Sequence, residues 1–191
     1  MSDLEFKSFA KMNRFHDETM FVTEKIDGTN AQIMVYESTP IVDEHTVVEP
    51  KRQLKIGSRN RWIEVGDDNF GFAHWCKQHE EELLKLPLGR HYGEWWGSGI
   101  QRGYNLKEKR LSLFNQSLHE IKSIIPCIDF VPVLYTGNFE LEKISEVLLE
   151  LKTNGSKASP GFDNPEGVVV YLKKSGLFFK RTFDDKHKWE K

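Results

Sequence analysis

Short apolar runs, separated by glycine, proline and polar residues, dominate the pattern along this chain. Runs of this length that are rich in β-branched and aromatic residues are typical of strands. They predict strands at residues 20–23, 31–37, 54–59, 90–97, 111–114, 129–134, 166–171 and 177–183. Lys174, Ser175 and Gly176 separate the last two runs, so we expect these two strands to form a hairpin.

Residues 68–86 have apolar side chains at three- and four-residue spacing, which predicts an amphipathic helix with Asp67 or Asp68 as its cap. We expect His79, which lies on the apolar stripe, to be a packing residue. The stripe consists of Phe72, Trp75, Cys76, His79, Leu83 and Leu86.

Residues 139–152 predict a second amphipathic helix, with Asn138 as its cap and Gly155 after its end. Its expected inward residues are Leu141, Ile144, Val147, Leu148 and Leu151. Residues 38–50, which contain two prolines, are expected to form a loop. The order of elements is strands, helix, strands, helix, strands. That order favours an α+β domain with antiparallel sheets over a doubly wound parallel sheet.

Length and composition exclude several classes of protein. With 191 residues, 38% hydrophobic and 29% charged, the chain has the composition of one soluble globular domain spanning residues 1–191. No apolar run approaches the roughly 20 residues that cross a bilayer, and the first residues lack a signal-peptide pattern. Cys76 and Cys127 lack metal-ligand spacing, which favours reduced thiols over a zinc site. We therefore expect an intracellular, cytoplasmic protein, in the host cytoplasm if the chain is viral.

The net charge of −2 excludes a polybasic chain, but a local basic face is enough to bind nucleic acid. Basic residues gather in three stretches of the sequence. Each stretch taken alone is typical of a solvated surface. The three clusters are Lys51, Arg52, Lys55, Arg59 and Arg61; Arg102, Lys107, Lys109 and Arg110; and Lys180, Arg181, Lys186 and Lys188.

The segment from Glu24 to Asn30 places a lysine, Lys25, between a predicted strand and the strand that follows. A lysine held on such a rigid support is a candidate nucleophile if its surroundings keep part of it neutral. Asp27 followed by Gly28 is equally an ordinary turn signal between two strands. This segment alone therefore leaves both interpretations open.

Other charged residues interrupt predicted strands in the same way. A buried charge is costly unless it is paired, so charges embedded in several strands predict that these strands line one polar groove. The alternative is a set of separate surface salt bridges, which stabilise a protein little. The residues concerned are Lys25, Asp27, Arg59, Glu94, Glu166, Lys180 and Arg181.

Six motifs in order resemble those of the covalent nucleotidyltransferase superfamily of ATP-dependent ligases and capping enzymes, and within it the nick-sealing RNA ligases of phage type. The motif around Lys25 is similar to the nucleophile motif, and its ending at Asn30 is the RNA-ligase form. The motif around Glu94 includes the glycine-rich tail of residues 97–101. The matching segments are 24–30, 58–59, 92–101, 113–114, 165–170 and 179–181.

The resemblance implies a fold and a set of roles. The fold would have two mostly antiparallel sheets with flanking helices around a nucleotide-binding groove, the ATP-grasp-like nucleotidyltransferase domain of ligases. Lys25 would attack the α-phosphate of ATP and form a lysine–AMP intermediate, and Glu166 would bind Mg²⁺ or Mn²⁺ through water. The other nucleotide contacts would be Glu24 and Ile26, partly through backbone groups; Asn30; Arg59 and Glu94 at the ribose; Phe114 on adenine; Lys180 at the α-phosphate; and Arg181 as an additional phosphate contact.

The implied activity is an ATP-dependent RNA ligase. It would transfer AMP to a 5′-phosphate end and join that end to a 3′-OH, on RNA that is most simply a nicked duplex, as a monomer. The amine must be neutral to attack, which nearby cations and partial desolvation would favour. The alternatives are a DNA ligase or capping-type core, and a non-catalytic module that binds nucleic-acid ends.

Three features depart from the family pattern. Lys180 is followed at once by Arg181, whereas the family usually has two lysines two positions apart. Asp27 resembles the DNA-ligase and capping form of the nucleophile motif. The chain ends at Lys191, so the resemblance implies no C-terminal OB or helical domain.

Overall fold

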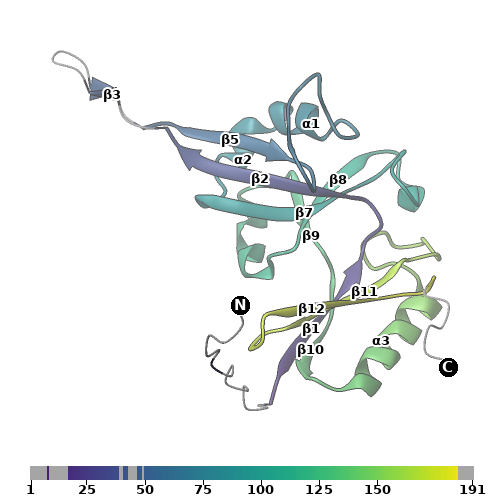
Figure 1. Ribbon diagram of the computed structural model, residues 1–191. Helices are drawn as coiled ribbons and strands as arrows, with labels where there is room; N and C mark the ends of the chain where they lie inside the picture. The colour runs from purple at the N-terminus through teal and green to yellow at the C-terminus, as the bar shows by residue number, and fades with distance from the viewer. Residues whose placement is uncertain (1–7, 9–16, 39–40, 43–46, 49, 185–191) are drawn as a thin grey trace, which may run out of the picture.

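Two β-sheets form the framework of the computed structural model, and each is covered on one face by helices (Figure 1). Helices α1 (Phe72–Gln78) and α2 (Glu80–Leu83) pack on the larger sheet, and α3 (Leu141–Asn154) packs on the smaller one. The structure describes residues 8, 17–38, 41–42, 47–48 and 50–184, so Lys186 and Lys188 lie outside the described residues. None of the helices in that described part has the length and apolarity that a bilayer crossing requires.

The smaller sheet has four antiparallel strands in the order β10-β1-β11-β12. Alternate side chains of β1 and β11 face α3, and the helix adds Ile144, Val147 and Leu151 to that core. The predicted hairpin is confirmed as β11 and β12. The strands are β1 (Thr19–Lys25), β10 (Val133–Asn138), β11 (Gly167–Leu172) and β12 (Leu177–Thr182).

The larger sheet has six strands in the order β6-β5-β2-β7-β8-β9. Its pairs are antiparallel except β8 with β9, which are parallel. The expected α+β fold with mostly antiparallel sheets is thus confirmed. The strands are β2 (Thr29–Glu37), β5 (Arg52–Gly57), β6 (Trp62–Ile63), β7 (Gly89–Gly97), β8 (Lys109–Leu113) and β9 (Ile128–Phe130).

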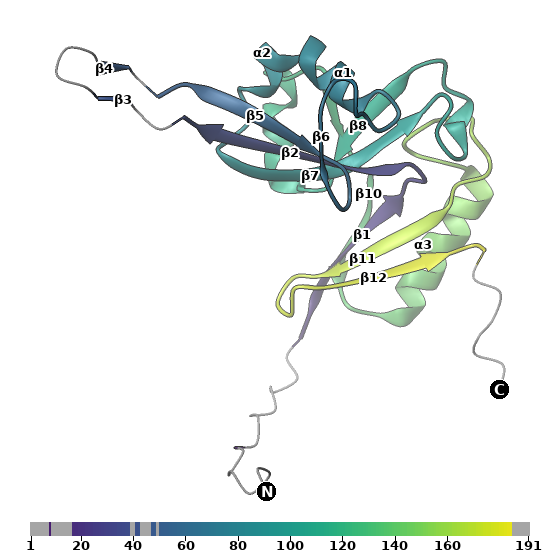
Figure 2. The ribbon, with the colours of Figure 1, turned by 45° about the horizontal axis from the view of Figure 1, so that its top comes forward.

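Short elements complete the fold, and several were absent from the sequence prediction. The expected loop at 38–50 contains the paired strands β3 (Ile41–Val42) and β4 (Val47–Val48), which extend beyond β2 and β5 in Figure 2. Two 3₁₀ helices, η1 (Gly103–Asn105) and η2 (Gln116–Ser123), lie on either side of β8 in the sequence. Each is too short to leave a periodic pattern.

The single helix predicted at 68–86 is wrong, because α1 and α2 are separated at His79. The backbone of His79 leaves helical geometry there, with φ −109° and ψ 20°. Its Nδ1 lies 2.9 Å from the carbonyl oxygen of Trp75, and the two rings stack at 4.5 Å. The N-cap position of α1 is occupied by Gly71, but the carboxylate of Asp68 accepts hydrogen bonds from the first-turn N–H groups of Ala73 and His74.

The second predicted helix is displaced, and one predicted strand is divided. The expected cap Asn138 belongs to β10 and pairs with Thr19, so the helix begins after Glu140, and Leu141 at its start is exposed. The run at 129–134 splits between β9 in one sheet and β10 in the other. Pro132 lies at the break and cannot donate a ladder hydrogen bond.

The chain passes from the smaller sheet to the larger one in residues 26–28, between β1 and β2. Ile26 is buried in a third core cluster with Trp96, Tyr104, Val131 and Phe162. The N–H of Gly28 donates to Glu94 Oε1 at 3.1 Å. A Cβ at Gly28 would lie 2.5 Å from the carbonyl oxygen of Trp95 and 2.7 Å from Trp96 Cβ. The crossing therefore requires glycine.

We expect Gly28→Ala to lower the free energy of unfolding by about 3 kcal/mol, because the added methyl meets the backbone of Trp95 and the Cβ of the buried Trp96. Denaturant unfolding measures this value. Gly176→Ala is the control: its Cβ would meet open space, so only the left-handed backbone at φ +69° costs about 1 kcal/mol. Equal losses in the two variants would contradict a steric requirement at Gly28.

Candidate active site

Lys25 lies at the end of β1, and its Nζ is 2.6 Å from Glu166 Oε2. The pairing of β1 with β11 places Lys25 opposite Gly167, which brings the preceding residue, Glu166, beside the amine. Both side chains are mostly buried, with 24% and 16% exposure. The hydrogen-bond partner of the amine among the described residues is thus an anion.

Glu24, beside Lys25 in β1, is 1% exposed and holds a loop from the far end of the sequence. Its carboxylate accepts hydrogen bonds from Ser156 Oγ at 2.6 Å and from the N–H groups of Lys157 at 2.8 Å and Ala158 at 2.9 Å. The side chain is therefore fully engaged, and only its backbone groups remain for a ligand. The contact between this loop and Glu24 was not predicted, because the polar residues of the loop carry no motif that points to Glu24.

Asp27 is held by Arg102, which lies in the glycine-rich run at 97–103, and by Tyr104, which directly follows that run. Its Oδ2 accepts a hydrogen bond from Arg102 Nε at 3.0 Å, and its N–H donates to Tyr104 Oη at 2.8 Å. Arg102 also donates to the carbonyl of Asn164 and pairs with Asp184. Neither Arg102 nor Tyr104 was predicted as a site residue. The run of glycines around Arg102 was the available signal.

Glu94 lies in β7 opposite Asn30 and accepts the hydrogen bond from Gly28. Burial raises the pKa of the Glu94 carboxyl to about 7. The positive charge of Lys25 and the Gly28 hydrogen bond oppose this rise, and the carboxylates of Glu166 and Asp27 add to it. Glu94 is therefore electrostatically coupled to the lysine and to two other acids of the site.

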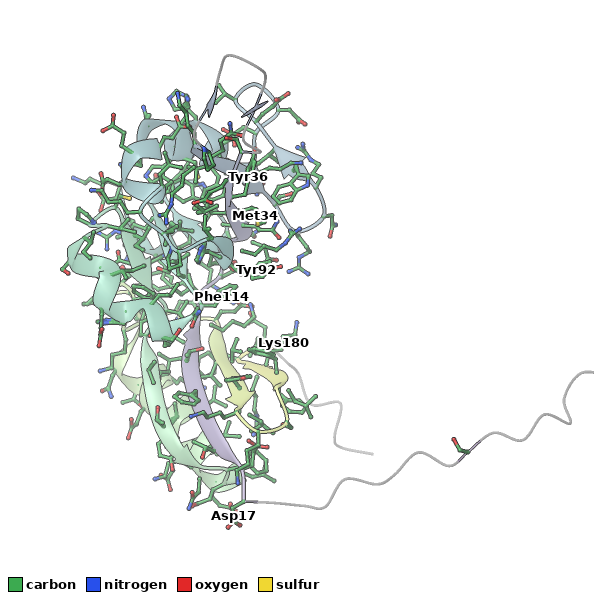
Figure 3. The ribbon with its side chains drawn as sticks, turned by 90° about the vertical axis from the view of Figure 1, so that its left-hand side faces the viewer. Asp17, Met34, Tyr36, Tyr92, Phe114 and Lys180 are labelled. Atoms are coloured by element: carbon green, nitrogen blue, oxygen red, sulfur yellow. The ribbon has the colours of Figure 1, made fainter. Side chains whose placement is uncertain are left out.

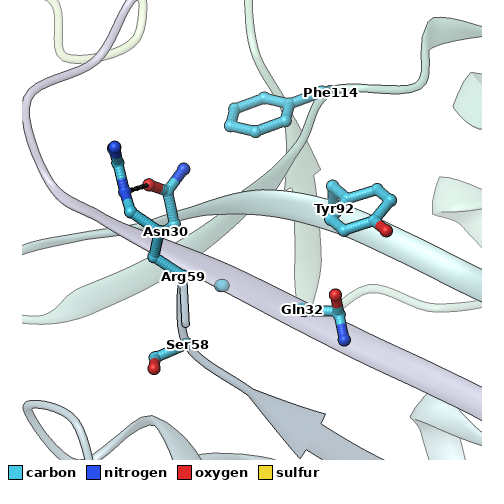
Figure 4. A pocket seen from close by; sticks show the side chains of 7 residues that line it. Asn30, Gln32, Ser58, Arg59, Tyr92 and Phe114 are labelled. Carbon is cyan, nitrogen blue, oxygen red and sulfur yellow. Dashed lines mark hydrogen bonds between the residues drawn. The ribbon is translucent and has the colours of Figure 1, made fainter. Parts of the chain in front are cut away.

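A pocket of about 350 Å³ opens beside these residues, on the six-stranded sheet. In it, Arg59 Nε donates to Asn30 Oδ1 at 2.7 Å, and the half-exposed ring of Phe114 faces them across the opening (Figure 4). An aromatic ring, a guanidinium and an amide suit a planar base with a polar sugar. The lining residues are Asn30, Ala31, Gln32, Ser58, Arg59, Tyr92 and Phe114.

Lys180 and Arg181 lie on β12 with exposed side chains that face opposite ways. Lys25 is opposite Gly167, and Lys180 is opposite Val169. Gly167 and Val169 are two residues apart, so Lys25 and Lys180 share one face of the sheet. Alternation places Arg181 on the other face, which α3 covers. Lys180 is thus brought to the side of the lysine, and Arg181 is not.

Metal binding was expected at Glu166. Among the described residues, no group of three or more His, Cys, Asp or Glu side chains is placed to hold a metal ion. Mg²⁺ and Mn²⁺ nevertheless bind through one or two carboxylates together with water and substrate phosphates. Glu166, whose charge helps to raise the pKa of Glu94, fits that kind of site. It does not fit a closed, all-protein metal cage.

Comparison with known proteins agrees with this arrangement. A sequence model of the RNA ligase family matches residues 18–185. No curated protein matches the chain. The fold is similar to solved structures of a Naegleria gruberi RNA ligase, covering 86% of this chain. A mutant without ligand and a mutant with ATP and Mn each have a TM-score of 0.58 and 20% identity. The same ligase with PPi has a TM-score of 0.57 and 21% identity.

The match covers 49% of each of these Naegleria structures, so the chain spans about half the length of the solved relatives. At this level of identity the likeness establishes the shared fold alone.

We expect the free energy of unfolding of the wild type to fall between pH 5 and pH 8. The folded pKa of Glu94, about 7, exceeds that of an unfolded glutamate, so the folded state holds an extra proton that it loses as pH rises. Glu94→Gln removes this dependence and should gain about 1–3 kcal/mol relative to wild type at pH 8 but little at pH 5. Urea unfolding at both values measures the difference.

Glu108→Gln serves as the control, because Glu108 is an exposed partner of Arg110. Its effect should be small at both pH values. A Glu94→Gln variant whose stability follows the wild type in parallel across this range would show that Glu94 does not titrate there.

Proposed function

This chain belongs to the RNA ligase family, and from that premise we propose that it is an ATP-dependent RNA ligase whose nucleophile is Lys25. The observation that carries the proposal is the position of Lys25. Its amine lies 2.6 Å from Glu166, next to Glu94 and to a pocket with the chemistry of a nucleoside site. ATP with Mn, and PPi, are bound in structures of the Naegleria ligase, which further supports a nucleotide and a divalent metal as ligands.

The proposed reaction has three steps. The neutral amine of Lys25 attacks the α-phosphorus of ATP, an N–P bond forms, and the bond to pyrophosphate breaks. An oxygen of an RNA 5′-phosphate then attacks the same phosphorus, and the lysine amine leaves. Finally a 3′-OH attacks the 5′-phosphorus, which joins the strands and releases AMP. Each step is an in-line displacement that depends on positioning and charge stabilisation.

The residues take the following roles in this proposal. Phe114 stacks on adenine, and Arg59 and Glu94 hold the ribose hydroxyls. Glu24 and Ile26 contribute backbone groups, since the side chain of Glu24 is engaged by the 156–158 loop and that of Ile26 is buried. The other assigned contacts are Asn30 in the nucleoside pocket, where it also positions the RNA end, and Lys180 at the α-phosphate.

Glu166 links the metal to the nucleophile. A divalent cation bound there, through water, would offset the charge that accumulates on the phosphate oxygens. The same carboxylate is the ion-pair partner of the Lys25 amine. A cation at Glu166 would therefore compete with the amine for this carboxylate and release the amine toward the α-phosphorus.

The proposed substrate is RNA with 5′-phosphate and 3′-OH ends at a nick in a duplex, acted on by a monomer. Residues 1–191 would serve as the nucleotidyltransferase domain. An intracellular, cytoplasmic location suits this proposal, because ATP is abundant there and both cysteines of the chain are free thiols.

We expect intact-mass analysis after incubation with ATP and Mg²⁺ to show the addition of one AMP to the wild type. Lys25→Ala should show none, because the attacking amine is gone. Lys152→Ala, in the last turn of α3, should be labelled like the wild type. Labelling with GTP in place of ATP would support a capping-type enzyme, and sealing of nicked DNA but not RNA would support a DNA ligase. A wild type that takes up no AMP would support a non-catalytic module.

Phe114→Ala should weaken the apparent affinity for ATP about 5- to 150-fold, because stacking on a base contributes about 1–3 kcal/mol. The ATP concentration that gives half-maximal adenylylation measures this effect. Phe139→Ala is a matched control, since Phe139 is also partly exposed and lies outside the pocket. An unchanged affinity in Phe114→Ala would remove the adenine contact from the proposal.

A further inference from the structure

One face of the six-stranded sheet, which we call the outer face, lies opposite α1 and α2. Strand register places Trp62, Gly57, Gln32 and Tyr92 in one row across β6, β5, β2 and β7 on this face. The residues directly before and after them in each strand point to the opposite face, toward the core. Gln32 and Tyr92 also line the nucleoside pocket. The row therefore runs without a break from the pocket to the edge strand β6.

Trp62 lies across the outer face because Gly57 has no side chain. A Cβ at Gly57 would be 3.1 Å from the Trp62 ring. Two cations reach the same ring: Lys55 Nζ lies 4.8 Å and Arg90 Cζ 5.3 Å from ring centroids of Trp62. Lys55 and Arg90 flank Met34 in the next row of the sheet, so both belong to the outer face.

These two cations have no acidic partner within the described ranges, whereas some other basic residues there do. Arg61, Lys77, Arg110 and Lys143, for example, each form an ion pair with an aspartate or glutamate. Lys55 and Arg90 instead share one indole, which brings two like charges close together. A phosphate between them would remove that repulsion, and a base could stack on the half-exposed ring.

The spacing suits a polynucleotide. Three strand separations lie between Trp62 and Tyr92, a distance of ~14 Å. A stacked strand advances 3.4 Å per nucleotide, so this distance corresponds to about four nucleotides. In Figure 3, Tyr36, Met34, Tyr92, Phe114 and Lys180 follow one another along one side of the molecule, which gives an RNA strand a continuous path past the pocket.

We propose that Trp62, Lys55 and Arg90 form an RNA-docking platform, which binds the substrate strand about four nucleotides from the end held in the pocket. A phosphate of that strand lies between the two cations, and a neighbouring base stacks on Trp62. This inference rests on the proposed ligase function, because the function supplies the RNA. The platform binds RNA and takes no part in the attack of Lys25 on ATP.

The test measures the affinity of a fluorescently labelled, 5′-phosphorylated single-stranded RNA of ten nucleotides, as a function of salt. In the double variant Lys55→Ala/Arg90→Ala we expect about tenfold weaker binding and a slope of log K against log salt that is smaller by about 0.7, since the one phosphate between the two cations is no longer neutralised. Trp62→Ala should weaken binding at least fivefold, and Trp62→Phe, which keeps an aromatic ring, should restore most of it.

Lys143→Ala is the control, because Lys143 also lies over an aromatic ring, that of Tyr135, but on α3. It should bind RNA like the wild type. An RNA of two nucleotides is too short to reach from the pocket to Trp62, so the wild type and the double variant should bind it equally. Thermal unfolding of every variant shows whether a loss of RNA binding comes from a loss of structure. If Trp62→Ala is unfolded, Trp62→Phe and the double variant still test the platform, because both keep an aromatic ring at position 62.

Self-adenylylation, followed by mass in the same preparations, separates this inference from the proposed function. All platform variants should take up AMP like the wild type. Normal AMP uptake with unchanged RNA affinity and salt slope in the double variant would overturn the platform and leave the ligase standing. Lost RNA affinity in a protein that never takes up AMP would support the platform and reject the ligase. A wild type that binds no RNA would overturn the platform outright.

Discussion

The chain has three residues, 26–28, in which to leave one sheet and enter the other, and the candidate site depends on how that passage is fixed. Ile26 is buried, the N–H of Asp27 donates to Tyr104, and the N–H of Gly28 donates to Glu94. With each residue held in this way, the end of β1 has no freedom to turn, and the amine of Lys25 is presented in one direction. Preorganised placement of a nucleophile is what group-transfer chemistry requires.

Three of the acids around the lysine, Glu24, Glu94 and Glu166, occupy different environments because they come from different parts of the fold. Glu24 points into a loop that donates three hydrogen bonds to it. Glu94 receives one backbone hydrogen bond while partly buried, and burial raises its pKa. Glu166 has the amine itself as its partner. One carboxylate is therefore structural, one is poised to titrate near neutral pH, and one is available to a cation.

The sequence predicted most of the longer strands, the α+β class and the ordered motifs, because strand periodicity and turn residues are local signals. It did not predict that residues 129–134 divide between two sheets, since both halves are apolar and only the pairing partners differ. The break at His79 depends on contacts with Trp75 that periodicity does not encode. At the site, motifs identified Lys25, Glu94 and Glu166, whereas Arg102 and the loop at 156–158 join it only through tertiary contacts.

The division at Pro132 makes the smaller sheet discontinuous in sequence: β1 comes before the larger sheet, and β10, β11 and β12 come after it. The larger sheet, from Thr29 to Phe130, is thus nested inside the smaller one. During synthesis, β1, which carries Lys25, has no partner strand until more than a hundred further residues have emerged. The larger sheet can form before that point, but Lys25 reaches its final environment only as one of the last events of folding.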